Sequence, residues 1–131
     1  SADALPHQPA PLSSEVQGYL QAGIAAYKQG RLDEAIVLLQ QGIEADPLAY
    51  KVHFHLGLLY GKRGQLYDGI QELETSLSLR SDFFPALKNL AVLYQNAGFR
   101  NKAIEMWERC LAAAPDEETR ENIKRMLLAV L

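Results

Sequence analysis

The spacing of hydrophobic residues predicts helices along almost the whole chain. From about residue 14 onward, apolar side chains recur at intervals of three and four residues, which is the spacing of one face of an α-helix. No alternating run of β-branched residues predicts a strand. Turn-forming residues interrupt the helical pattern at Gly30, Asp46-Pro47, Gly64, Ser81-Asp82, Gly98 and Pro115-Asp116. Residues 14–114 therefore divide into helices of roughly 14 residues, joined by short turns between antiparallel neighbours.

The first residues of the chain differ from the rest. Pro6, Pro9 and Pro11 cannot continue a helix, so the sequence predicts a flexible or polyproline-like leader over residues 1–13. A serine at position 13 or 14 is then a suitable N-cap for the first helix. The chain starts with serine rather than methionine, as expected for a processed form or for a piece of a longer protein.

The helical pattern repeats every 34 residues, an interval that we call the repeat length. Three blocks of this size align without a gap: 16–49, 50–83 and 84–117. Position 8 holds a small residue where two helices must approach closely, namely Gly23, Gly57 or Ala91. Position 15 is glycine in each block, which predicts a left-handed residue ending the first helix of a pair, at Gly30, Gly64 and Gly98. The period therefore describes a helix pair that occurs three times.

These blocks resemble the tetratricopeptide repeat family, whose signature of about 34 residues is W-x2-L-G-x2-Y, then A-x3-F, then P. The residues that match the first part of the signature are Tyr19 with Gly23, Leu56-Gly57 with Tyr60, and Leu90-Ala91 with Tyr94. The chain departs from it where Tyr19, His53 and Leu87 replace Trp, at Gly69 and at Ser81. Glycine inside a helix costs about 1 kcal/mol relative to alanine, so we expect the second repeat to be the softest. The resemblance implies an all-α solenoid of three antiparallel helix pairs within a domain spanning 14–131.

A last helix is predicted over residues 117–131. Acidic residues at its start suit the positive end of the helix dipole, and its apolar stripe fits a helix that caps the exposed end of a repeat stack. Met126, Leu128 and Leu131 widen the apolar surface beyond that stripe. Two interpretations stay open: this end is partly a contact surface, or the natural chain continues.

Composition and charge exclude several classes of protein. The chain has 131 residues, 48% of them hydrophobic, and a net charge of −3, so no overall basic field favours nucleic acid. Its apolar runs are too short to insert into a membrane, and no signal segment opens it. The single cysteine, Cys110, excludes an internal disulfide and fits a reducing compartment. We expect a bacterial, cytoplasmic protein, or a periplasmic one if the chain is a processed fragment.

No combination of residues predicts catalysis, a cofactor or a metal site. His53 and His55 are two residues apart, so on a helix they point about 200° apart and cannot share a metal. Cys110 is expected to be a buried, inert thiol, and Trp107 a core residue. The glycine turns lack the Lys-Ser/Thr ending of a phosphate-binding loop. Three carboxylates on the second helices are expected to be solvated acids: Glu72, Glu74 and Glu105. The chain is therefore not expected to be an enzyme.

The family resemblance implies where a partner binds. In such a stack the first helix of each pair lines a concave groove, and the groove residues implied here are Leu20, Ile24, Tyr27, Lys28, Lys51, Phe54, His55, Leu58, Lys62, Lys88, Asn89, Val92 and Asn96. The apolar members are expected to be exposed as a stripe, which is typical of a binding surface. Across 16–29, 50–63 and 84–97 all charged residues are positive, whereas the second helices are mostly acidic.

These features predict an adaptor or scaffold that binds a peptide or helix bearing both apolar and acidic side chains. Asn89 and Asn96 are expected to hydrogen-bond the partner backbone. Co-chaperones of this family grip the terminal carboxylates of heat-shock proteins with Lys, Asn and Arg; the matching positions here are Leu20, Ile24, His55, Pro85 and Asn89, so the clamp is absent. The architecture is similar to bacterial three-repeat modules such as class II type III secretion chaperones. The alternative is a weak homo-oligomer assembled through the last helix or through Leu5 and Leu12.

Overall fold

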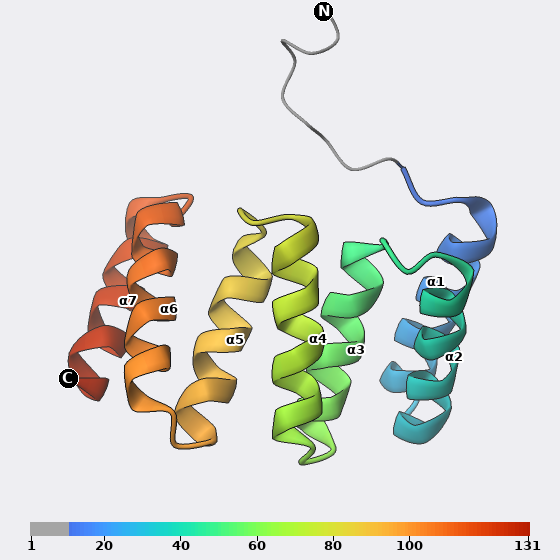
Figure 1. Ribbon diagram of the computed structural model, residues 1–131, viewed down its shortest axis with the longest axis horizontal. Helices are drawn as coiled ribbons and strands as arrows, with labels where there is room; N and C mark the ends of the chain where they lie inside the picture. The colour runs from blue at the N-terminus through green and yellow to red at the C-terminus, as the bar shows by residue number, and fades with distance from the viewer. Residues whose placement is uncertain (1–10) are drawn as a thin grey trace, which may run out of the picture.

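The computed structural model describes residues 11–131, in which all regular structure is helical. Seven helices follow one another along a layered array (Figure 1): α1 Ser14–Lys28, α2 Leu32–Ala45, α3 Tyr50–Lys62, α4 Leu66–Leu79, α5 Phe84–Asn96, α6 Arg100–Ala113 and α7 Glu117–Val130. Each helix packs against its neighbours in the chain, and α3 also contacts α5. The expected solenoid of three antiparallel helix pairs with a capping helix is confirmed. Most of the predicted leader, including Leu5, lies outside the described residues.

The corners between the helices of each pair end in left-handed glycines. Gly30, Gly64 and Gly98 have φ angles of 79°, 86° and 85°. At the first corner, the N–H of Arg31 donates to the carbonyl oxygen of Ala26 (2.9 Å), which closes a Schellman motif. The predicted role of these glycines is therefore confirmed, because a residue with a Cβ is strained at such angles.

Side-chain caps fix the two ends of the described array. The hydroxyl of Ser13 accepts a hydrogen bond from the N–H of Val16 (3.3 Å), which decides between the two candidate serines. Asp116 accepts from the N–H of Thr119 (2.7 Å), and this hydrogen bond lowers the pKa of the carboxyl group. Both caps satisfy backbone N–H groups that the helices themselves leave without partners.

Two clusters of buried residues form the core. The first cluster joins α1, α2 and α3, and the second extends from α3 to α7. Helix α3 belongs to both, since Val52 and Leu56 lie in the first cluster and Phe54 in the second. Trp107 and Cys110 are fully buried in the second cluster, as predicted.

Gly69 has a packing role that the sequence did not reveal. A Cβ at this position would lie 2.9 Å from the carbonyl oxygen of Gly57 and 2.9 Å from Cδ1 of Leu93. Such contacts are too short for the backbone to stay where it is. We had expected Gly69 to be less stabilising than alanine, and this expectation was wrong in sign, because the glycine allows α3 and α4 to approach closely.

Candidate functional site

The predicted groove residues lie on α1, α3 and α5, and we call the surface that they form the first-helix face. Residues one repeat length apart occupy equivalent places on these three helices. The direct contact between α3 and α5 makes adjacent parts of the face continuous. One surface can therefore present side chains from successive repeats to the same partner.

Four lysines carry the positive charge of the first-helix face. Lys28, Lys51, Lys62 and Lys88 are all exposed. Within residues 11–131, none of them has a carboxylate within ion-pair distance. Their charges are thus available to a partner.

Two other charged residues change the predicted separation of positive first helices from acidic second helices. Arg63 donates to the carboxylate of Asp33 across the first two repeats (2.9 Å), so this cation is already paired. Helix α1 begins before the repeat block and includes Glu15 in its first turn. The unpaired positive charge therefore rests on the four lysines.

The apolar members of the face are less exposed than predicted. Tyr27 is exposed, and Ile24, Leu58 and Val92 are half-buried. The expectation that Leu20 and Phe54 are exposed was wrong, since they are only 5% and 8% accessible.

The next repeat in the array covers both of these side chains. Leu20 belongs to the core cluster that also contains Val52 of α3. Phe54 packs edge-to-face on Phe83, which precedes α5, with ring centroids 5.1 Å apart. The apolar stripe therefore consists of the half-buried Ile24, Leu58 and Val92, with the exposed Tyr27 at its end.

The polar members of the face can act as hydrogen-bonding groups. His55 is half-buried. Its pKa is lowered mainly by burial and also by the nearby positive charge of Lys51. The side-chain amide of Asn89 donates to the carbonyl oxygen of Pro85 (2.7 Å), which leaves its own oxygen free to accept. Asn96 is exposed at the end of α5.

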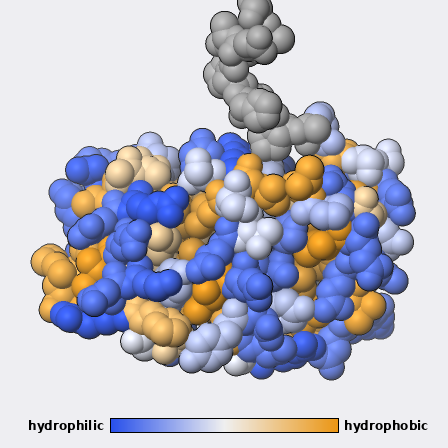
Figure 2. Space-filling model, viewed as in Figure 1, coloured by the Kyte–Doolittle hydropathy of each residue, from blue (hydrophilic) through white to orange (hydrophobic). Residues whose placement is uncertain are grey.

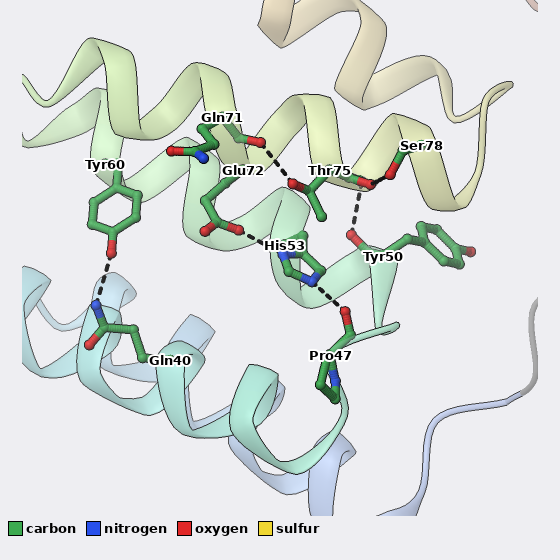
Figure 3. A network of polar contacts seen from close by, with 10 residues as sticks. Gln40, Pro47, Tyr50, His53, Tyr60, Gln71, Glu72, Thr75 and Ser78 are labelled. Carbon is green, nitrogen blue, oxygen red and sulfur yellow. Dashed lines mark hydrogen bonds and ion pairs between the residues drawn. The ribbon is translucent and has the colours of Figure 1, made fainter.

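His53 forms a buried polar link that sequence reasoning missed (Figure 3). Its Nδ1 lies 2.6 Å from Oε2 of Glu72, and its Nε2 lies 2.7 Å from the carbonyl oxygen of Pro47. Both ring nitrogens can donate to these two oxygens at the same time only in the imidazolium form of the ring. Burial opposes this charge, but the hydrogen bonds to Glu72 and Pro47 outweigh it and raise the pKa of His53. The interpretation of His53 as a packing residue therefore omitted its charge.

Tyrosine hydroxyls join successive repeats at equivalent positions. The hydroxyl of Tyr60 accepts from Nε2 of Gln40 (2.8 Å), as Figure 3 also shows, and one repeat length later Tyr94 donates to Glu74. Burial raises the pKa of Tyr94, and the hydrogen bond to Glu74 raises it further. The expectation that Glu72 is simply solvated was wrong, because it is half-buried and bound to His53. Glu74 is exposed, as expected, and in addition accepts a hydrogen bond from Tyr94. The signal in the sequence was that the two tyrosines are one repeat length apart and that their partners, Gln40 and Glu74, are one repeat length apart as well.

The described residues offer little for metal or thiol chemistry. Within residues 11–131, no group of three or more His, Cys, Asp or Glu side chains could hold a metal ion. Burial raises the pKa of the Cys110 thiol to about 11, so it is protonated and unreactive at neutral pH. No helix in the described part of the chain is long and apolar enough to cross a membrane.

The opposite, second-helix side is mainly hydrophilic, with apolar atoms visible in furrows between the helices (Figure 2). An open cleft of about 370 Å³ lies between α4, α5 and α6. Its lining includes Leu77, Leu90 and Met106 together with charged residues of both signs. The two signs compensate, so this cleft lacks the single sign of charge found on the first-helix face.

The contact of the leader with the array is intramolecular where it is described. Leu12 is half-buried and packs against the first core cluster of its own chain. Part of the Leu12 side chain stays accessible.

Comparisons with known proteins find one family and many similar folds. The family described as TPR repeat matches residues 23–64. The photosystem I assembly protein Ycf3 of Prochlorococcus marinus is 26% identical over 99 residues, which are 69% of this chain and 57% of that protein. The chain thus spans less than two thirds of the length of this relative.

Two solved structures illustrate the similarity of fold. The type III secretion translocator chaperone SycD of Yersinia enterocolitica matches with a TM-score of 0.83 at 15% identity, over 92% of this chain and 86% of that one. The first TPR of Spaghetti (RPAP3), bound to an HSP90 peptide, matches with a TM-score of 0.80 at 19% identity, over 90% and 97% of the two chains. At these identities the matches show a shared fold.

Proposed function

We propose that the chain, whose residues 23–64 match the TPR repeat family, is an adaptor that binds a peptide or helix on its first-helix face. The observation that carries the proposal is the set of four exposed lysines without ion-pair partners in the described chain. They surround a half-buried apolar stripe. A partner with acidic and apolar side chains complements both features.

The partner is not held in the way suggested by one of the similar structures. That structure contains the HSP90 peptide SRMEEVD, which is acidic toward its end. Here the positions of the family's carboxylate clamp hold uncharged residues, and Leu20 among them is buried. We therefore propose recognition of acidic side chains along a segment instead of a terminal carboxylate.

A titration tests this proposal. The probe is a fluorescein-labelled peptide with glutamates in one half and leucines in the other, titrated with the wild type and with Lys51→Ala/Lys62→Ala. We expect the double substitution to weaken binding about tenfold, and added salt to weaken wild-type binding, because the lysines are exposed. Lysine variants are preferred to Phe54→Ala, which would also damage the core.

Lys102→Ala is the matched control, because Lys102 is exposed on the second helix α6. It should bind the peptide like the wild type. Equal losses in the control and the double variant, or no wild-type binding, would remove the first-helix face from the account.

Self-association through α7 is the second candidate function. It is favoured by Leu128 and Leu131, which are exposed large apolar residues on the last helix. Light scattering over a concentration series separates the two functions, since an adaptor that does not self-associate keeps a monomeric mass. Leu128→Asp should then leave that mass unchanged.

A further inference from the structure

Helix α7 continues the register of the first helices. The apolar stripe places Ile24, Leu58 and Val92 one repeat length apart, and the next residue in this series is Met126. Helix α7 packs on α6, as α3 packs on α2 and α5 on α4. Its buried side, marked by Ile123, belongs to the second core cluster, whereas Met126 is 40% exposed. Met126 therefore occupies the same place on α7 that the stripe residues occupy on the first helices.

A cleft lies beside this position. It has a volume of about 280 Å³ between the end of α5, the start of α6 and the end of α7. Gln95 and Ala129, which are also one repeat length apart, both line it, together with the apolar Val130. Ala129 and Val130 are one turn beyond Met126, so the three lie on neighbouring positions of one helix face.

Two polar side chains that line the cleft each make hydrogen bonds within the chain. Nε of Arg100 donates to the carbonyl oxygen of Val130 (2.8 Å), and another of its nitrogens donates to that of Leu131. The side-chain oxygen of Gln95 accepts from Nε1 of Trp107 (3.3 Å). Gly98, Ala103, Ala129 and Val130 supply the rest of the lining, so the space between them can receive an apolar side chain.

Charge changes along the same surface. The four unpaired lysines lie on α1, α3 and α5, with two of them on α3. The equivalent positions of Lys51, Lys62 and Lys88 on α7 hold Thr119, Val130 and Asn122, none of which is charged. At these equivalent positions the surface is thus basic on the first helices and uncharged on α7.

We propose that α7 forms the fourth helix of the binding surface, and that the α5–α7 cleft receives an apolar side chain at one end of a segment whose acidic residues lie over α1 and α3. This inference rests on the proposed function of the first-helix face. The bound segment is therefore acidic at one end and apolar at the other.

The test uses substitutions on α7 with two peptides. One peptide has an acidic half and a leucine-containing half, and the other has the acidic half alone. Met126→Asp and Ala129→Phe, which fills the cleft, should each weaken binding of the longer peptide about tenfold, the loss expected when one buried apolar side chain is displaced. Both variants should bind the acidic peptide like the wild type.

Leu128→Asp is the matched control, because Leu128 is on the same helix and 71% exposed but points about 160° away from Met126. It should bind both peptides normally. If it weakens binding as much as Met126→Asp, or if neither α7 variant matters while Lys51→Ala/Lys62→Ala still does, the inference about α7 is wrong and the proposed function stands. Loss of the lysine effect as well overturns both.

Discussion

At the scale of single residues, the structure assigns opposite roles to glycines that look alike in the sequence. Gly18 and Gly69 both lie inside helices, where glycine is a poor helix former. A Cβ on Gly18 would meet no atom within 4 Å, whereas one on Gly69 would meet the carbonyl oxygen of Gly57 at 2.9 Å. Helix propensity decides the first case, and close packing decides the second.

Alanine substitutions at these two positions should therefore change stability in opposite directions. Gly18→Ala should raise the free energy of unfolding by about 0.5–1 kcal/mol, because it removes only the conformational cost of glycine. Gly69→Ala should lower it by about 1–3 kcal/mol, because the backbone must move apart. Urea unfolding followed by circular dichroism measures both. A stabilising Gly69→Ala would contradict the packing argument.

The charged His53 makes stability depend on pH. Its pKa in the folded protein is raised above the value of about 6.5 expected for the unfolded chain. Its stabilising contribution is therefore fully present below about pH 6.5 and is lost as the pH rises through the folded pKa. His53→Leu should cost about 1–3 kcal/mol at pH 6, because Glu72 and the Pro47 carbonyl lose their donor, and the difference from wild type should shrink at higher pH.

His55 serves as an internal comparison in that experiment. Its pKa is lowered, so its contribution is present above about pH 6.5 and is lost as the pH falls through the folded pKa. Because His55 is unchanged in His53→Leu, it cancels from the difference between the two proteins. An NMR titration in which His53 loses its proton at a lower pH than His55 would refute the assignment.

At the scale of helices, equivalent places in successive repeats are joined by different chemistry. At the first junction Arg63 bonds both Asp33 and Gln65, which pins the corner of one repeat to the next. At the second junction, Tyr67 takes the place of Asp33 and Phe99 takes the place of Gln65. Their rings pack edge-to-face with centroids 6.0 Å apart. An ionic contact and an aromatic contact thus do the same structural work at the two junctions.

The tyrosine pairs allow a comparison between a neutral and a charged hydrogen bond. Tyr60→Phe removes a bond with an amide and should cost about 0.5–1.5 kcal/mol. Tyr94→Phe removes a bond with the carboxylate of Glu74 and should cost about 1.5–3 kcal/mol. Tyr27→Phe is the control, since the Tyr27 hydroxyl has no hydrogen bond within residues 11–131. Thermal unfolding that ranks the three otherwise would show that these bonds do not hold the repeats together.

The sequence predicted the elements well because the period constrains them strongly. Left-handed glycines and helical spacing place every corner, and these are local properties of the chain. The exposure of Leu20 and Phe54 could not be predicted in the same way, because it depends on how closely the next repeat approaches. The pairing of His53 with Glu72 also escaped, since each residue alone looks like a packing or solvent-facing position. The errors are therefore in contacts between elements.

At the scale of the whole molecule, α3 connects two cores that otherwise belong to different repeats. The first core contains Leu39 of α2, and the second contains Trp107 of α6. Residues on α3 lie in both, so losing the first core removes part of the support of the second. Repeat arrays can unfold in parts when the interface between neighbours is weak. The shared helix argues that this array unfolds as one unit.

Leu39→Ala tests whether the two cores unfold together, because Leu39 lies in the first core and the fluorescent Trp107 lies in the second. Leu39 is fully buried, and its truncation should lower the free energy of unfolding by about 2–5 kcal/mol. If the cores are coupled, the unfolding midpoint seen by Trp107 fluorescence should fall together with the midpoint seen by circular dichroism. Leu73→Ala, in the second core, provides the matched control and should move both signals as well. A fluorescence midpoint that stays at the wild-type value in Leu39→Ala would mean that the second core stands without the first, and that α3 does not transmit the loss.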